Sequence, residues 1–317
     1  MNYYFYRPEI SSYQGEAFRV KERQSLEQLG VKCVDTPIEI PDNENVIVIS
    51  TSYTDNENIV SSLKHTNIAL WIHPNSGYDN FSLDFVKNAT FPIVLGNEIR
   101  ANAVAQFYLQ SLLNHQGNIP QRHQWDQART YNRKLLHTKK TLIIGRGPIG
   151  ERLGNALETL DVNVSYYDPY ENKQQNTKYF QEELTNSDII IMACSLNKTS
   201  HHLLNEDIFS LLKNDVLIMN AARGKLIDQQ ALVSFLSKNK EAHAIIDVFE
   251  KEPIEFSEFN HLSNITLSSH IAGVYKGIND AIIKFEKRVV RDYLHDQKLE
   301  LYKTALLSSR VKGNFLI

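Results

Sequence analysis

The 317-residue sequence is poor in cysteine and has no excess of basic side chains, and each shortage excludes a class of protein. Its two cysteines, Cys33 and Cys194, are far apart in the sequence. They therefore provide neither a disulfide framework nor a zinc site, which would need four closely spaced ligands. There are 34 basic and 37 acidic side chains, and the formal net charge is −3. No basic excess remains to neutralise a nucleic-acid backbone, so a nucleic-acid partner is not expected.

Long apolar runs are also missing. The longest ones, such as 189–194, fall far short of the roughly 18 residues that span a membrane. The first nine residues do not combine a basic stretch with an apolar run, so no secretory signal is expected. We therefore expect a cytoplasmic protein without a membrane partner. The composition, 42% hydrophobic and 22% charged, is that of an ordinary globular chain, and the length predicts two domains.

Short apolar runs alternate with amphipathic stretches in two blocks, which predicts parallel sheets covered by helices on both faces. In the first block we expect strands at 3–6, 31–34, 46–50, 68–72 and 92–95, and helices at 17–29, 57–64 and 83–88. In the second block we expect strands at 141–144, 162–167, 188–193, 215–220, 244–248 and 265–268, and helices at 151–160, 180–185, 205–212 and 229–237.

Two longer helices are expected outside these blocks. Residues 98–113 are free of turn residues and predict one helix between the blocks, whereas 280–295 predict an amphipathic helix after the second block. If this last helix packs on the first block, the first domain is discontinuous. The predicted domains are then 1–97 with 279–317, and an inserted domain of 98–278.

A glycine-rich turn opens the second block. Gly145, Gly147 and Gly150 form a G-x-G-x-x-G pattern directly after a predicted strand. The first glycine permits a tight turn, the second lets backbone N–H groups approach a pyrophosphate, and the third allows close helix packing. Asp168 ends the next predicted strand, where its carboxylate can bind ribose hydroxyls and repel a 2′-phosphate. The pattern favours NAD over NADP, and a glycine turn without a ligand is the alternative.

Three further strands of the second block lead into charged or titratable residues. Arg223 follows the first of them, Glu250 and Glu252 follow the second, and His270 follows the third. Because ligands of open α/β sheets bind outside the carboxyl ends of the strands, we expect Arg223, Glu252 and His270 to converge near the cofactor.

Structural explanations remain open for these residues. Arg223 would pair with a helix C-terminus, Asp247 would be a strand-end acid, and His270 would be one solvated residue among 11 histidines. Glu250 competes with Glu252 for the role of the acid. The neighbours His201 and His202 cannot easily share a metal, so this pair is expected in a loop and no metal site is predicted.

Four segments carry a resemblance to a known family. They are Asn-Ala-Ala-Arg-Gly at 220–224, Asp-Val-Phe at 247–249 with Glu252-Pro253, Ser-His-Ile-Ala-Gly at 269–273, and Ser-Gly-Tyr-Asp-Asn at 76–80. The first three, in this order behind the glycine turn, resemble motifs of the D-isomer-specific 2-hydroxyacid dehydrogenases, and the segment at 76–80 resembles the substrate-carboxylate loop of that family. The resemblance implies a Rossmann NAD domain inserted into a flavodoxin-like substrate domain, both doubly wound parallel sheets.

The resemblance also implies roles for the strand-end residues. His270 would be the general acid–base, and Glu252 would orient its imidazole and favour the protonated form, raising its pKa. Arg223 would clamp the substrate carboxylate or polarise its carbonyl. Asp247 would bind the nicotinamide carboxamide. The residues implied around the cofactor are Gly145, Arg146, Gly147, Pro148, Ile149, Gly150, Asp168, Cys194, Ser195, Ala221, Ala222, Arg223, Asp247, His270 and Gly273.

In the first domain, the resemblance places the substrate carboxylate on backbone N–H groups around Asn75, Ser76 and Gly77. Any turn uses residues of this kind, so an ordinary turn is the alternative. Several positions depart from the family pattern, among them Arg100 and Gln106 where Asn and Glu are common. Arg100 leads to the hypothesis that it pairs with a second anionic group of the substrate, and the alternative is a surface salt bridge.

The sequence therefore predicts an NAD-dependent enzyme that interconverts a 2-keto acid and a D-2-hydroxy acid. A dehydrogenase of a phosphorylated 2-hydroxy acid, similar to phosphoglycerate or erythronate phosphate enzymes, is the alternative within this class. An NAD-responsive binding protein on the same fold is the alternative outside it. By analogy with the family, the helix at 98–113 is expected to form a homodimer surface.

Overall fold

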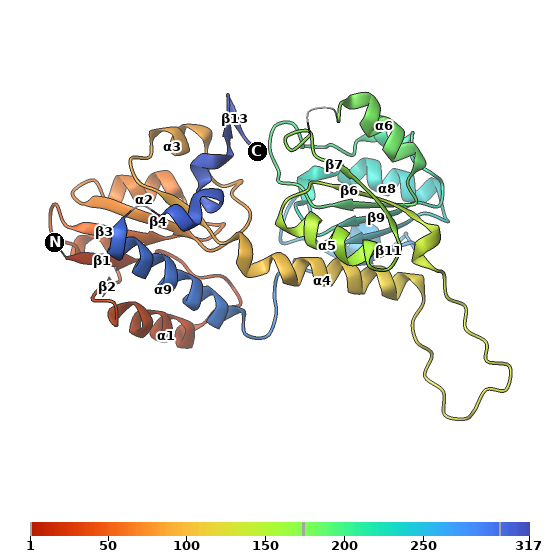
Figure 1. The fold of residues 1–317 in the computed structure, drawn as a ribbon, viewed down its shortest axis with the longest axis horizontal. Helices are drawn as coiled ribbons and strands as arrows, with labels where there is room; N and C mark the ends of the chain where they lie inside the picture. Colours follow the sequence, from red (N-terminus) through yellow and green to blue (C-terminus); the bar gives the residue numbers. More distant parts are fainter. Residues whose placement is uncertain (1, 173–174, 298) are drawn as a thin grey trace. The chain divides into compact units, whose positions relative to one another are not determined.

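The computed structural model describes residues 2–172, 175–297 and 299–317 (Figure 1). The chain divides into two compact units. Unit 1 comprises Met1–Arg100 and Val274–Ile317, and unit 2 comprises Ala101–Gly273. The first crossing between them falls inside helix α4, Asn97–Gln116.

Unit 1 is built on a five-stranded sheet in the order β2-β1-β3-β4-β5, in which every neighbouring pair is parallel. Its strands are β1 Tyr3–Tyr6, β2 Lys32–Val34, β3 Asn45–Ile49, β4 Asn67–His73 and β5 Ile93–Leu95. This is the flavodoxin-like order, as the sequence predicts. All residues of β3 are buried, because both faces of the sheet are covered.

Helices cover both faces of this sheet. Helix α1, Glu16–Glu27, lies beside α9, Ile278–Asp296, although they come from opposite ends of the chain (Figure 1). Their apolar residues share one core cluster, and the side chains of α2, Asn56–Ser62, and α3, Leu83–Asn88, contribute to a second one. The apolar stripe of 280–295 therefore packs within unit 1.

A buried ion cluster joins β1, α1 and α9. Arg7 Nε donates to both carboxylate oxygens of Glu22, at 2.8 and 3.0 Å, and Arg7 Nη2 donates to Glu286 Oε1 at 2.5 Å. All three side chains are almost inaccessible to solvent. Burial raises the pKa of Glu286 well above its usual range, against the opposing charge of Arg7. A single guanidinium thus faces two buried carboxylates, and burial favours the protonated form of Glu286.

Unit 2 contains a parallel sheet in the order β11-β10-β9-β8-β6-β7. Its strands are β6 Lys140–Ile144, β7 Asn163–Tyr167, β8 Ile189–Met192, β9 Leu217–Asn220, β10 His243–Ile246 and β11 Ile265–Leu267. The helices are α5 Pro148–Glu158, α6 Thr177–Asn186, α7 Glu206–Phe209 and α8 Gln229–Lys238. The sheet runs in both directions from β6, which makes the unit doubly wound.

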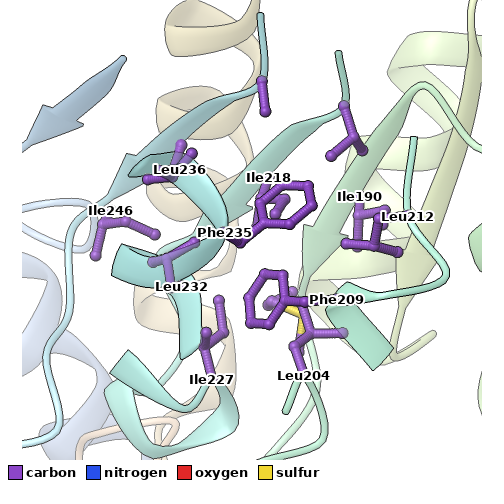
Figure 2. Close-up of a cluster of buried hydrophobic side chains, with 14 of the residues drawn as sticks. Ile190, Leu204, Phe209, Leu212, Ile218, Ile227, Leu232, Phe235, Leu236 and Ile246 are labelled. Atoms are coloured by element: carbon purple, nitrogen blue, oxygen red, sulfur yellow. The ribbon is translucent and has the colours of Figure 1, made fainter. Parts of the chain in front are cut away.

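Apolar side chains fill both faces of this second sheet. On one face, Phe209 of α7 and Phe235 of α8 approach each other to 5.2 Å between ring centroids, over Ile218 of β9 (Figure 2). On the other face, α4 contributes Tyr108 and Leu112 to a cluster with α5 and the sheet. The strands whose carboxyl ends carry the predicted site residues are thereby packed between two apolar clusters.

Three parts of the chain differ from the sequence-based expectation. Helix α7 is shorter than 205–212, because after Phe209 the chain tightens into turns in which Leu211 and Leu212 bond the carbonyls three residues back. Residues 117–135 form a long irregular arm with no regular element (Figure 1). A small hairpin, β12 Val311–Lys312 with β13 Phe315–Leu316, follows α9.

Short 3-10 helices complete the secondary structure. They are η1 Pro37–Glu39, η2 Leu136–Thr138, η3 Gly224–Leu226, η4 Phe256–Phe259, η5 Glu300–Ala305 and η6 Leu307–Arg310. None of the described helices is long and apolar enough to cross a lipid bilayer.

Candidate functional site

Two glycines of the turn after β6 are required by the protein's own packing. Gly145 has φ +99°, and a Cβ there would lie 2.7 Å from Cys194 Cα. A Cβ on Gly150 would lie 2.0 Å from the Gly145 carbonyl oxygen. Any larger residue would therefore push α5 away from the end of β6.

Gly147 is different, because a Cβ there would meet no protein atom within 4 Å. It is the N-cap of α5, and Pro148 occupies the first helical position. The space before the helix N-terminus is thus open, where unpaired N–H groups and the helix dipole favour an anion. A dinucleotide pyrophosphate fits this position.

Asp168 lies at the end of β7, next to the glycine turn. Its Oδ2 accepts the Arg146 N–H at 2.8 Å, and its Oδ1 accepts the Tyr170 N–H at 3.2 Å. The Arg146 guanidinium lies 4.8 Å from the centre of the Tyr166 ring. The carboxylate is therefore fixed by backbone donors and only half-buried, which suits it to accept bonds from ribose hydroxyls.

Glu252 and His270 are brought together as predicted. His270 Nδ1 lies 2.7 Å from Glu252 Oε2, and the other carboxylate oxygen accepts the Phe249 N–H at 2.9 Å. Burial raises the pKa of Glu252, but bonds from His270 and Phe249 and the nearby Arg223 charge outweigh it and place that pKa below its usual value. Glu252 is thus an ionised acceptor at neutral pH. It fixes the Nδ1 proton of His270, and Nε2 is left to meet a ligand.

The His270 loop is organised by Asp247, which is fully buried at the end of β10. Its Oδ1 accepts from Ser268 Oγ at 2.5 Å and from the Ile271 N–H at 2.9 Å, and its Oδ2 accepts the Ala272 N–H at 2.9 Å. Its carbonyl oxygen accepts the His270 N–H at 2.8 Å. These bonds support the strand-end structural explanation, and contact with a nicotinamide remains a proposal.

The arginine loop packs directly on the acid loop. A Cβ on Gly224 would lie 1.9 Å from the Phe249 carbonyl carbon, so only glycine permits this contact. Asn220 Nδ2 donates to the Arg223 carbonyl at 2.9 Å, and Arg223 Nη1 donates to the Ala222 carbonyl at 2.8 Å. Arg223 therefore belongs to the same group of strand-end residues as Glu252 and His270.

Glu250 has different partners from Glu252. Its Oε1 lies 3.0 Å from His202 Nε2 and accepts the Gln229 N–H, at the start of α8, at 2.9 Å. The rings of His201 and His202 stack with centroids 4.1 Å apart. Within the described residues, no cluster of His, Cys, Asp and Glu is arranged to hold a metal ion. The geometry thus distinguishes the two glutamates that compete in the sequence.

Sequence reasoning missed Tyr108. Its buried hydroxyl donates to the Met192 carbonyl and accepts the Ala221 N–H at 2.6 Å, so α4 joins the ends of β8 and β9. One tyrosine in a helix of mixed composition gives no signal of this role. The remaining predicted cofactor residues lie in unit 2: Pro148 and Ile149 begin α5, and Cys194, Ser195, Ala222 and Gly273 lie in segments that follow strands. Burial raises the pKa of Cys194 to about 12, so its thiol is not a nucleophile at neutral pH.

In unit 1, the predicted substrate loop follows β4. Arg100 Nη1 donates to the Pro74 carbonyl and Nη2 to the Tyr13 hydroxyl, both at 2.5 Å. Asn75 Nδ2 donates to Ser52 Oγ at 3.2 Å. Arg100 makes no ion pair with a carboxylate in the part of the chain that the structure describes, so it is not the surface salt bridge considered above.

The turn, the helix N-terminus and the strand-end acid are those of dinucleotide-binding α/β proteins. Residues 109–272 match the family described as D-isomer specific 2-hydroxyacid dehydrogenase, NAD binding domain. The chain belongs to this family.

Individual proteins extend the comparison. The chain is 30% identical over 164 residues to the Arabidopsis thaliana glyoxylate/hydroxypyruvate reductase HPR3, covering 51% of each. It is 29% identical over 236 residues to the erythronate-4-phosphate dehydrogenase of Wigglesworthia glossinidia brevipalpis, covering 72% of this chain and 58% of that one. The matches thus span between half and two thirds of these relatives.

The fold matches that of the Aquifex aeolicus D-lactate dehydrogenase in complex with NAD and lactic acid. The TM-score is 0.73 at 20% identity, with 96% of this chain and 99% of that one covered. Both parallel sheets therefore belong to the known architecture of this family.

Proposed function

We propose that the protein is an NAD-dependent dehydrogenase that interconverts a 2-keto acid and a D-2-hydroxy acid. The pair of His270 and Glu252 carries the proposal, since an imidazole held at 2.7 Å by an ionised carboxylate is a general acid–base in working orientation. The family membership and the nucleotide turn support it. Unit 2 would bind the cofactor, and unit 1 would bind the substrate.

His270 would move the proton of the reaction. Glu252 accepts the Nδ1 proton, so that Nε2 gives a proton to the keto oxygen during reduction and takes it back during oxidation. The His270 side chain is 48% exposed, which leaves its ring accessible to a substrate. Arg223 would bind the substrate carboxylate or polarise the carbonyl, because its planar guanidinium can donate two parallel hydrogen bonds.

The turn after β6 would hold the cofactor. The open N-terminus of α5 at Gly147 would bind the pyrophosphate, and Asp168 the adenosine ribose. Bound NADH supplies the hydride. The Asp168 carboxylate would repel a 2′-phosphate, which supports NAD over NADP.

Unit 1 would bind the substrate carboxylate through the backbone N–H groups of Asn75, Ser76 and Gly77. Arg100 would add a charge for a second anionic group, since it keeps donors beyond those used by Pro74 and Tyr13. If Arg100→Ala leaves the ratio of kcat/KM between dianionic and monoanionic keto acids unchanged, this role is wrong.

A phosphorylated 2-hydroxy acid is the second candidate substrate. Two observations favour it: the Arg100 guanidinium has no carboxylate partner among the residues that the structure describes, and the chain is similar to an erythronate-4-phosphate dehydrogenase. A phosphate carries up to two negative charges and would match the bidentate donors of an arginine.

A cytoplasmic homodimer is proposed as the working form. The arm of residues 117–135 presents Ile119 and Trp125 with 90% and 73% exposure, and Leu113 of α4 is also exposed. Apolar side chains on such an arm favour contact with a second copy. Light scattering of the purified protein and of Trp125→Ser tests the dimer, and cell fractionation tests the location.

The experiment that tests the function is NADH oxidation against a panel of 2-keto acids. The panel contains glyoxylate, pyruvate, hydroxypyruvate, branched and aromatic keto acids, oxaloacetate and phosphohydroxypyruvate. NADPH and the His270→Ala protein serve as controls. Turnover that prefers NADH and needs His270 supports the proposal. No turnover despite NADH binding would indicate an NAD-responsive binding protein.

A further inference from the structure

A chain of hydrogen bonds runs through the interior of unit 1 to the substrate loop. Trp71 Nε1 donates to Ser50 Oγ at 2.8 Å, and Ser50 Oγ lies 2.8 Å from His73 Nδ1. His73 Nε2 lies 2.9 Å from the Gly77 carbonyl oxygen. The side chains of Trp71, Ser50 and His73 are fully buried.

The first and last groups of this hydrogen-bond chain determine which atoms donate and which accept. An indole N–H only donates and a carbonyl oxygen only accepts. Ser50 therefore accepts from Trp71, and in the neutral form of His73 it donates its hydroxyl hydrogen bond to Nδ1. In that form His73 carries its proton on Nε2, where it donates to the Gly77 carbonyl. Tautomer and orientation are both fixed from inside the core.

Three of the loop carbonyls, those of Pro74, Asn75 and Gly77, are held by different donors. Arg100 Nη1 bonds the Pro74 oxygen, the Gly96 N–H bonds the Asn75 oxygen at 3.2 Å, and His73 bonds the Gly77 oxygen. In a trans peptide group the oxygen and the next N–H point in opposite directions. Holding the carbonyls against unit 1 therefore turns the following N–H groups away from these donors.

The N–H groups of Asn75 and Ser76, which follow the held carbonyls of Pro74 and Asn75, are available as a result. The Gly77 N–H belongs to the same residue whose carbonyl His73 holds, and none of these three N–H groups has an acceptor among the described residues. Ser76 Oγ is also buried without a hydrogen-bond partner in that part of the chain. Successive unpaired N–H groups form a concave site that attracts an anion.

We propose that His73 is a positioning residue for the substrate carboxylate. By fixing the carbonyl of Gly77 it sets the end of the loop whose N–H groups bind that carboxylate. The inference rests on the proposed function for its kinetic consequence. The hydrogen-bond chain itself can be tested without turnover.

The kinetic test compares His73→Leu with His73→Gln, because the glutamine amide keeps a donor near the position of Nε2. His73→Leu should raise KM for the best keto acid about tenfold and leave kcat and the Kd for NADH within twofold, as expected for loss of one ground-state contact. His73→Gln should recover most of the affinity. His65→Leu is the matched control, since His65 Nε2 contacts the Ile40 carbonyl at 3.1 Å elsewhere in unit 1. Equal KM values for His73→Leu and His65→Leu would overturn the proposal.

The second test reads the tautomer by nitrogen NMR of the protein labelled at histidine. We expect the His73 proton on Nε2, and a shift toward the other tautomer in Ser50→Ala. A proton on Nδ1 in the wild-type protein would overturn the proposal. If the wild type shows the expected tautomer but reduces no keto acid, the proposed function fails, whereas the hydrogen-bond chain stands. Should His73→Leu not fold, Ser50→Ala takes its place and should raise KM about threefold; an unchanged KM would overturn the role.

Discussion

Two turns of this protein follow parallel strands and leave backbone N–H groups unpaired among the described residues, and we propose both as anion sites, yet they are shaped in different ways. The turn after β6 is shaped by glycine, since a Cβ on Gly145 or Gly150 would collide with backbone atoms. The loop after β4 is shaped by side chains, since Arg100 of α4 and His73 at the end of β4 hold its carbonyl oxygens. One shape is specified by glycines within the turn, and the other depends on side chains outside the loop, including one 26 residues away.

This difference explains why the turn after β6 could be predicted from the sequence pattern and the loop after β4 could not. A turn that is shaped by its own glycines can be recognised from the sequence pattern. The glycine turn after one strand and Asp168 at the end of the next strand were therefore both predicted. A shape held by tertiary contacts leaves no pattern at the loop itself. Asn75, Ser76 and Gly77 were predicted only through a resemblance, and nothing in the sequence indicated that Ser50 and Trp71 act behind them.

The largest expected effect concerns the proposed acid–base of unit 2. His270→Ala should lower kcat about 10²- to 10⁴-fold, because a positioned acid–base contributes that much. Glu252→Gln should lower kcat less, since the amide can still accept from Nδ1 but carries no charge. Steady-state kinetics of both variants check this. Unchanged kcat in His270→Ala would assign the proton transfer to another group.

The glycine turn itself supplies the next largest effect. Gly150→Ala should destabilise the protein by about 1–3 kcal/mol, because the new methyl group overlaps the Gly145 carbonyl oxygen. Gly147→Ala should leave stability within about 0.5 kcal/mol and weaken NADH binding about tenfold by narrowing the anion site. Urea unfolding and NADH titration measure the two quantities. Equal stability of both variants would show that the turn is not fixed by packing.

The smallest expected effect concerns pH. His115 and His243 of unit 2 lie 4.7 Å apart between ring centroids. Burial, with His115 nearby, lowers the pKa of His243 to about 4. Since the folded state prefers the neutral ring, its contribution to stability is complete above about pH 6.5, the usual histidine pKa, and is lost as pH falls toward 4.

Glu286 of unit 1 changes the stability of the protein with pH in the opposite direction. Its pKa is raised, so its folded form binds a proton and stability falls as pH rises above the usual glutamate range. Between pH 4 and 8, the His243 contribution should make the melting temperature increase with pH, and this increase should be smaller in His243→Gln than in the wild type. The Glu286 contribution should make the melting temperature decrease with pH, and this decrease should be smaller in Glu286→Gln than in the wild type. Identical pH profiles for the wild type and both variants would contradict this account.

The strand ends show most clearly what the sequence could and could not decide. Alternating apolar runs located all eleven parallel strands within two residues at each end, because buried parallel strands are apolar throughout. The strand pattern alone did not choose between Glu250 and Glu252, and only the resemblance, through the neighbouring Pro253, favoured Glu252. The choice depends on how the segment after β10 turns, which places one carboxylate on His202 and the other on His270. The role of Tyr108 could not be predicted, because its hydroxyl bonds backbone groups at the ends of two strands that are distant in the sequence.

The divided sequence of unit 1 has a consequence for synthesis. Helix α1 packs against α9, but α9 begins at Ile278, and β5 ends at Leu95. The ribosome therefore adds 182 residues (278 − 95 − 1) between them. At about 5–20 residues per second this takes on the order of 10–40 s. Unit 2 is contiguous and can fold in that interval, while the apolar face awaiting α9 stays uncovered. In a newly made chain, the first segment of unit 1 therefore keeps an apolar surface exposed long after its last strand has been synthesised.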